Sequence, residues 1–188
     1  AGYIEAGSFV SPKAIPQMAG SDEVFDGLSR RKDVVYAALT PNMRGYDQAV
    51  ASGADEVAVF SAASEAFNQR NINCSIAESL ARFEPVMEAA ARDQIRVRGY
   101  VSCVVGCPYE GAISPEHVRD VSQSLLDMGC YEISLGDTIG AGTPETVAAM
   151  LEAVLKVTEA DKVAGHYHDT GNRALKNIEA SLESGIRT

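Results

Sequence analysis

The stretch Gly129-Cys130-Tyr131-Glu132-Ile133-Ser134-Leu135 decides the fold, because it ends a helix and begins a strand. Glycine adopts the left-handed backbone that ends many helices, so it marks the helix-to-strand junction. The same pattern, a glycine that ends a helix just before a strand, recurs at Gly2-Tyr3-Ile4-Glu5, at Gly53-Ala54-Asp55-Glu56 and at Gly185. Ile186-Arg187-Thr188 should begin a further strand where the sequence stops. We therefore expect a segment of a longer repeat, cut at both ends.

Strand and helix patterns alternate between these junctions. Strands are expected at residues 3–10, 34–40, 56–60, 95–102, 131–135 and 162–168. Helices are expected after three start signals: the capping box Ser75–Glu78, carried through Ala91, and the cap-proline pairs Ser114-Pro115 and Thr143-Pro144. From Pro115 onward, one buried stripe is predicted at Val118, Val121, Leu125 and Met128.

This alternation predicts a parallel sheet, and the nearly continuous apolar strands fit burial on both faces. We interpret residues 1–188 as a single partial catalytic domain, a TIM-type (βα)8 barrel that is incomplete and contains about strands 2–7. A doubly wound sheet is the alternative.

Composition narrows the possible functions. The chain has 188 residues, 46% of them hydrophobic, and a net charge of −10. The negative charge argues against a nucleic-acid partner, and an anionic substrate would need a local cation or metal. No apolar run reaches the length of a membrane span, so we expect a cytoplasmic protein. Its four cysteines are expected to be reduced.

His166-Tyr167-His168, followed by Asp169, is the strongest chemical signal. On a strand, residues i and i+2 point to the same face, at a spacing at which two imidazoles can hold a divalent ion. Two ordinary polar residues at a strand end are the alternative for this pattern.

Polar residues accumulate at the carboxyl ends of the expected strands, where a barrel places its active site. They are Glu5 and Ser8, Thr40 and Asn42, Ser61 and Ser64, Tyr100 and Ser102, Ser134 and Asp137, and His166 and His168. Each alone could be a structural hydrogen-bonding residue. Their presence at the same end of six strands predicts an active site there.

Seven segments together resemble 3-hydroxy-3-methylglutaryl-CoA lyase of the bacterial type, nearly end to end. They are Ser8–Lys13, Leu39–Asn42, Asn71–Ser75, Arg98–Cys103, Gly106–Gly111, Ser134–Gly140 and His166–Thr170. The segment around Cys103 and Cys107 is specific to this lyase. The last two segments also resemble isopropylmalate, homocitrate and citramalate synthases, so a condensing synthase is an alternative, as is a metal-binding fragment without catalytic activity.

The resemblance implies Mg²⁺- or Mn²⁺-assisted cleavage of an acyl-CoA substrate to acetyl-CoA and acetoacetate, as in leucine degradation and ketone body formation, by a homodimer. By resemblance, His166 and His168 bind the metal, Glu5 and Asp137 are catalytic, Ser8, Asn71, Ser134 and Thr138 bind substrate, and Asp169 orients a histidine. The alternatives are a supporting hydrogen-bond partner for Glu5 and a loop cap for Asp137. We interpret Cys103 and Cys107 as packing or loop residues. The family's other metal ligands, an aspartate and an asparagine, and its catalytic cysteine lie outside these residues.

Overall fold

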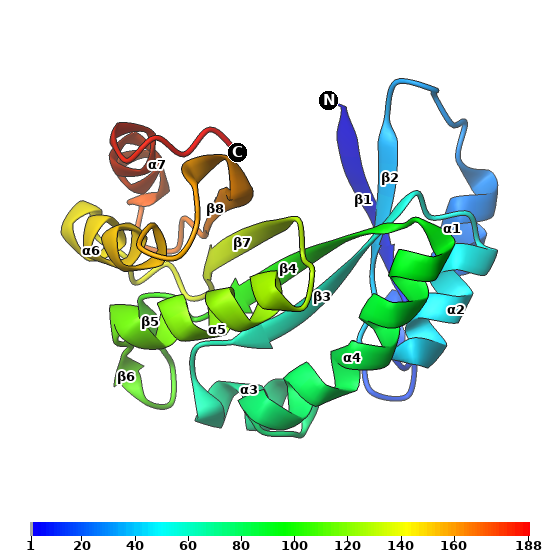
Figure 1. Ribbon diagram of the computed structural model, residues 1–188, viewed down its shortest axis with the longest axis horizontal. Coiled ribbons are helices and arrows are strands. Elements are labelled where there is room, and N and C mark those ends of the chain that lie inside the picture. The colour runs from blue at the N-terminus through cyan, green and yellow to red at the C-terminus, as the bar shows by residue number, and fades with distance from the viewer. Residues whose placement is uncertain (1) are drawn as a thin grey trace. The chain divides into compact units, whose positions relative to one another are not determined.

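The computed structural model describes residues 2–188 and alternates strands with helices (Figure 1). The strands are β1 (Tyr3–Ser8), β2 (Val35–Leu39), β3 (Glu56–Ala62), β4 (Arg96–Ser102), β5 (Gly106–Cys107), β6 (Gly111–Ala112), β7 (Glu132–Asp137) and β8 (Val163–Tyr167). The helices are α1 (Ser21–Gly27), α2 (Met43–Ala51), α3 (Glu65–Ile72), α4 (Ile76–Asp93), α5 (Pro115–Asp127), α6 (Pro144–Val154) and α7 (Ala174–Glu183), with 3-10 turns η1 (Pro16–Met18) and η2 (Ala160–Lys162).

The main sheet has the strand order β1-β2-β3-β4-β7-β8, and β5 and β6 form a separate antiparallel pair. Each strand of the main sheet follows its predecessor in sequence, as in a barrel. A doubly wound sheet reverses its order at a switch point, so this alternative is wrong. All six expected strands are present, with limits that differ by two residues or fewer. Helix α3 and the β5–β6 pair were not predicted.

The chain divides into two compact units, which we describe separately. The first contains the residues up to Phe60 together with Arg82–Arg98. Here β1 pairs with β2 and β2 with β3, all in parallel. The buried rings of Phe25, Tyr46 and Phe83 contribute to its core.

The second unit contains Ser61–Ala81 and Gly99–Thr188. In it β7 pairs in parallel with β8, and α6 packs against both α5 and α7. The predicted stripe of α5 is confirmed at Val118, Val121 and Leu125, which are buried. These side chains join Ile133 and Leu135 of β7 in the apolar core.

Helix ends follow the expected chemistry. Gly53, Gly129 and Gly185 all have positive φ, at 81°, 108° and 92°, as predicted for residues that end helices. Ser75 and Glu78 form the predicted capping box, because each side chain accepts a hydrogen bond from the other residue's amide. Within residues 2–188, no helix combines the length and the apolar character needed to cross a membrane.

Candidate metal site

The two histidines lie side by side at the end of β8. His166 is in the strand and His168 follows it, and both are exposed. Their Nε2 atoms are 3.2 Å apart, and their ring centroids are 5.1 Å apart. The expectation that the two imidazoles share one face is confirmed.

A backbone carbonyl orients His168. Its Nδ1 lies 2.7 Å from the carbonyl oxygen of Thr138, in the turn after β7. A carbonyl only accepts hydrogen bonds, so Nδ1 carries a proton, and in the neutral ring the lone pair is then on Nε2. A histidine that binds a metal through Nε2 needs this tautomer. Such ligands typically donate the other ring N–H to a carbonyl or carboxylate oxygen.

The distance between the two nitrogens fits one divalent ion. Neighbouring ligands of an octahedral ion at about 2.1 Å are about 3.0 Å apart, close to the 3.2 Å separation of the two Nε2 atoms. Among residues 2–188 no group of three or more His, Cys, Asp or Glu side chains could hold a metal. The pair alone is not a complete ligand set, and Mg²⁺ or Mn²⁺ bound to it would require added oxygen donors.

Strand register separates the predicted residues of β7 into two faces. Gly136 lies opposite His166, and Asp137 lies opposite Tyr167. Because side chains alternate along a strand, Ser134 and Gly136 share the face of His166, whereas Asp137 shares the face of Tyr167. Gly136 has no side chain, and a Cβ at this position would lie 3.4 Å from the Val101 carbonyl oxygen. Ser134 lies deeper on the same face and is buried.

Asp137 caps the turn that follows its own strand. Its side chain is fully buried, Oδ1 accepts a hydrogen bond from the Ala141 amide at 3.0 Å, and Oδ2 accepts one from the Gly142 amide at 2.8 Å. This is the geometry of the loop cap that was the alternative to a catalytic role. Direct catalysis by Asp137 stays a prediction.

Asp169 is engaged at the start of α7. Its Oδ1 accepts a hydrogen bond from the Ala174 amide at 3.0 Å, whereas Nδ1 of His168 faces Thr138. Asp169 was expected to orient a neighbouring histidine. For His168, the contact on Nδ1 comes from the Thr138 carbonyl instead. The physical reason is that the first amides of a helix have no acceptor within the helix, and a nearby carboxylate supplies one.

Three other predicted residues lie in separate surroundings. Glu5 is exposed on β1, and Ser8 is buried at the end of β1, where its amide and carbonyl both bond the Ser21 hydroxyl. Asn71 was expected in a loop, but it lies exposed in the last turn of α3. Ser64 caps α3 by accepting from the Phe67 amide, a local start signal that sequence reasoning missed. Their roles stay predictions.

Cys103 and Cys107 are both buried, as expected for packing residues. Burial raises the pKa of the Cys103 thiol to about 12. Burial alone would also raise the pKa of Cys107, but hydrogen bonds from the Ser64 hydroxyl, at 3.0 Å, and from the backbone amides of Tyr109 and Glu110 outweigh it and lower that pKa. This hydrogen-bonded sulfur was not predicted.

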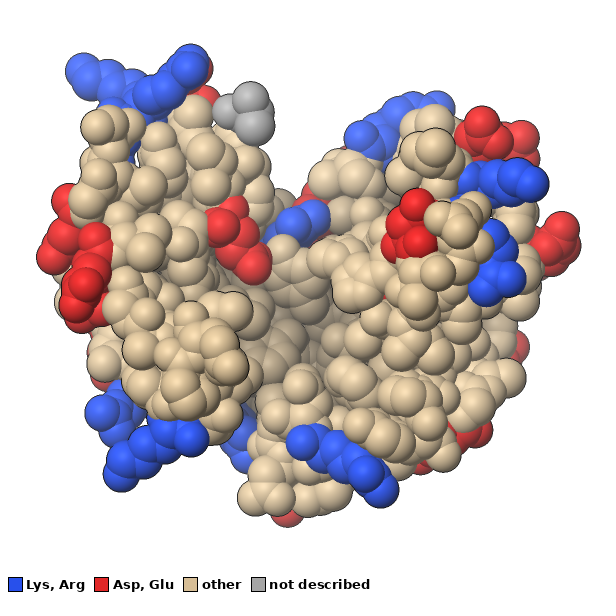
Figure 2. All heavy atoms as spheres, turned by 180° about the vertical axis from the view of Figure 1, so that it is seen from behind, with Lys and Arg blue, Asp and Glu red and all other residues tan. Residues whose placement is uncertain are grey.

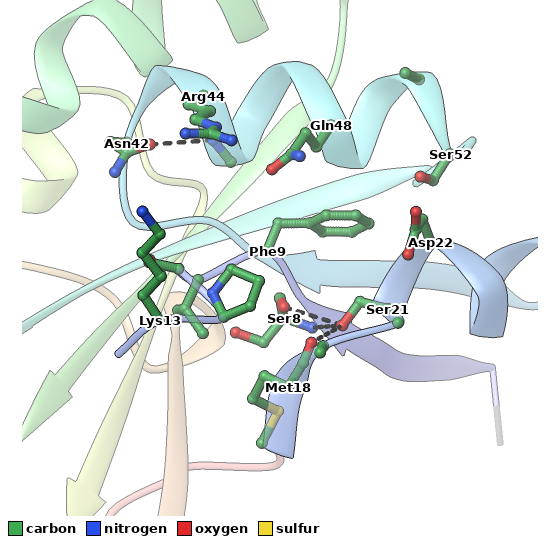
Figure 3. A pocket seen from close by; sticks show the side chains of 17 residues that line it. Ser8, Phe9, Lys13, Met18, Ser21, Asp22, Asn42, Arg44, Gln48 and Ser52 are labelled. Carbon is green, nitrogen blue, oxygen red and sulfur yellow. Dashed lines mark hydrogen bonds between the residues drawn. The ribbon is translucent and has the colours of Figure 1, made fainter. Parts of the chain in front are cut away.

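A cavity of about 730 Å³ lies in the first unit, beyond the end of β1. Figure 3 shows Arg44 and Gln48 of α2 on one side of it and Lys13 on the facing segment. The sequence reasoning missed both cations, although each lies in or next to a segment that carries the family resemblance. On the face shown in Figure 2, acidic and basic side chains form small groups, some of which contain both signs, with uncharged surface between them. An anionic ligand would therefore have to meet local cations.

The parallel strands in sequential order define an incomplete (βα)8 barrel, and a histidine pair lies at the end of its strand β8. A family model described as HMGL-like matches residues 3–188, and the chain belongs to this family.

A curated relative from Pseudomonas aeruginosa, named 3-hydroxy-3-isohexenylglutaryl-CoA/hydroxy-methylglutaryl-CoA lyase, is 60% identical over 98% of this chain and 61% of its own length. The chain thus spans about three fifths of that relative. A solved HMG-CoA lyase from Brucella melitensis has a TM-score of 0.98 and 58% identity, covering 99% of this chain and 66% of that one. An HMG-CoA lyase from Acinetobacter baumannii was solved with coenzyme A and 3-methylmalate. It has a TM-score of 0.94 and 36% identity, and the match covers 99% of this chain and 61% of that one.

Proposed function

We propose that the whole protein cleaves 3-hydroxy-3-methylglutaryl-CoA to acetyl-CoA and acetoacetate with the aid of Mg²⁺ or Mn²⁺. The observation that carries the proposal is the pair of Nε2 atoms 3.2 Å apart, in a chain 60% identical to a relative named as such a lyase. The names of the relatives favour a lyase over a condensing synthase. A cytoplasmic location, a homodimer and a place in leucine degradation stay predictions from the resemblance.

The reaction breaks the carbon–carbon bond beside a tertiary hydroxyl. The hydroxyl loses its proton, its carbon becomes the ketone of acetoacetate, and the bonding electrons leave as the enolate of acetyl-CoA, which then takes up a proton. A divalent cation, when bound, would supply positive charge that stabilises the deprotonated hydroxyl. His166 and His168 would hold that ion.

The chain's own residues would position the substrate and move protons. Ser134 lies on the face of His166, and we propose that it contacts the substrate. Ser8 and Asn71 are proposed substrate contacts by resemblance. Of the two proposed catalytic carboxylates, Glu5 is exposed, whereas both oxygens of Asp137 accept hydrogen bonds from its own turn. We propose that the exposed Glu5 exchanges protons with the substrate.

We further propose that the cavity of the first unit receives the anionic part of the coenzyme A thioester. Lys13 and Arg44 provide two cations in a chain of net charge −10. Phosphate groups are recognised by such side chains through charge-assisted hydrogen bonds. Replacement of Lys13 or Arg44 by alanine should raise KM for the thioester more than it lowers kcat, and an unchanged KM would contradict this assignment.

The test of the activity uses the complete protein and the substrate 3-hydroxy-3-methylglutaryl-CoA. Formation of acetoacetate should stop in the presence of a chelator and return with Mg²⁺ or Mn²⁺. His166→Ala and His168→Ala should each lower turnover and Mn²⁺ affinity. His117→Ala is the matched control, because His117 is the third histidine, exposed on α5. Cleavage unaffected by chelation would refute the metal role, and condensation of acetyl-CoA with a 2-oxo acid would favour the synthase.

A further inference from the structure

Thr138 contacts two other segments of the second unit at once. Its Oγ1 accepts a hydrogen bond from the Cys103 amide at 2.8 Å, and its carbonyl oxygen accepts from Nδ1 of His168 at 2.7 Å. The Thr138 hydroxyl also donates a hydrogen bond of 3.4 Å to the Gly136 carbonyl oxygen. The side chain that resemblance assigned to the substrate is thus engaged within the protein.

The Cys103 amide reaches Thr138 through an unusual backbone conformation. Cys103 has φ of 60°, in the left-handed region that residues other than glycine rarely adopt. Such conformations cost about 1 kcal/mol or more and persist where surrounding contacts determine them. Here the Cys103 amide points to the Thr138 hydroxyl, and the neighbouring Val104 amide bonds the Gly136 carbonyl at 3.1 Å. The segment after β4 is therefore bonded to the end of β7.

We infer that Thr138 is a positioning residue for the metal ligand His168. The hydroxyl and the carbonyl belong to one residue, so a hydrogen bond that fixes the hydroxyl also restricts the peptide plane that aims the carbonyl. That carbonyl sets the tautomer and the ring orientation of His168. The inference rests on the metal site of the proposed function.

The test measures Mn²⁺ affinity by electron paramagnetic resonance or calorimetry in the complete protein. Thr138→Val keeps the shape of the side chain and removes the acceptor for the Cys103 amide. Mn²⁺ affinity should therefore fall by about tenfold, the lower end of the affinity loss that is typical when a residue supporting a metal ligand is changed. Thr138→Ser keeps the hydroxyl and should restore affinity to within about twofold of wild type, a rescue that a packing role for the methyl group would not give. If Thr138→Val does not fold, Thr138→Ala carries the same expectation.

Thr146→Val is the matched control. Its Oγ1 accepts from the Thr143 amide at 2.9 Å in the cap of α6, so the variant loses a hydrogen bond of the same kind without contacting His168. Thermal stability should fall in this control while Mn²⁺ affinity stays unchanged.

Three outcomes would overturn the inference. Wild-type Mn²⁺ affinity in Thr138→Val, with a loss in His168→Ala, would leave the metal site intact and remove the role of Thr138. A raised KM alone would make Thr138 a substrate contact. Equal Mn²⁺ affinity in wild type and His168→Ala would refute both the metal site and the inference.

Discussion

Replacement of Asp137 by asparagine distinguishes its two possible roles. Both carboxylate oxygens accept amide hydrogen bonds, from Ala141 at 3.0 Å and from Gly142 at 2.8 Å, and the side chain is fully buried. Asparagine has the same shape but only one acceptor oxygen. Whichever way the new amide is turned, its NH₂ group faces a backbone N–H and one hydrogen bond is lost.

The expected cost follows from these two bonds. A hydrogen bond to a charged group contributes about 1.5–3 kcal/mol, and the bond that remains weakens to about 1 kcal/mol once its acceptor is neutral. Removal of a buried charge offsets part of this loss. We expect Asp137→Asn to lower the free energy of unfolding by about 2–4 kcal/mol, or Tm by roughly 4–16 °C for a chain of this size.

Urea unfolding and thermal denaturation measure the effect. Asp161→Asn is the control, because Asp161 is exposed in η2, and it should change stability by no more than about 0.5 kcal/mol. If Asp137→Asn unfolds like wild type but abolishes cleavage, the cap is energetically unimportant and the carboxylate acts in catalysis. That result would refute the reasoning from burial and hydrogen bonds.

Two further changes test the same region. Gly140→Ala would place a Cβ 2.7 Å from the His168 carbonyl oxygen, in a residue with φ of 64°. The free energy of unfolding should therefore fall by at least about 1–2 kcal/mol, and Mn²⁺ affinity should fall with it. Unfolding and Mn²⁺ titrations that match wild type would contradict this. For Cys107, burial raises the thiol pKa, but hydrogen bonds from Ser64 and backbone amides outweigh burial and lower this pKa overall. The thiolate therefore stabilises the fold fully above the unfolded pKa of about 8.5, and this stabilisation is lost as the pH falls through the folded pKa. The stability of wild type minus that of Cys107→Ser should therefore rise in urea titrations from pH 6 to about pH 9, and a flat or falling difference would argue against a stabilised thiolate.

Features with local causes could be predicted from the sequence. The capping box of Ser75 and Glu78 joins residues three apart, so the residues themselves reveal it. The same holds for the glycines that end helices, and for the histidine pair, whose shared face follows from strand alternation alone. The positions of β3 and β7 followed because buried parallel strands are apolar almost throughout.

The hydrogen bonds that shape the proposed metal site were not predictable in this way. His168 and Thr138 are separated by 30 residues, and Thr138 and Cys103 by 35. These pairs meet only because β7 is next to both β4 and β8 in the sheet. Sequence reasoning named the adjacent carboxylate of Asp169 as a partner for a histidine, but it did not find the contact on Nδ1 of His168, because a carbonyl from a distant turn gives no signal in composition or spacing.

The turn Asp137–Gly142 illustrates how structural and functional demands coincide. It is held by its own carboxylate, by the Cys103 amide, by Arg173 on the carbonyls of Gly140 and Ala141, and by Asn177 on the carbonyl of Gly142. A turn held from several elements has little freedom to move, so its Thr138 carbonyl presents a fixed acceptor to His168. The exposed histidines can therefore be ordered for an ion although their own side chains lie at the surface. Much of the precision of the proposed metal site then comes from buried polar contacts behind it, where substitutions should alter metal affinity and stability together.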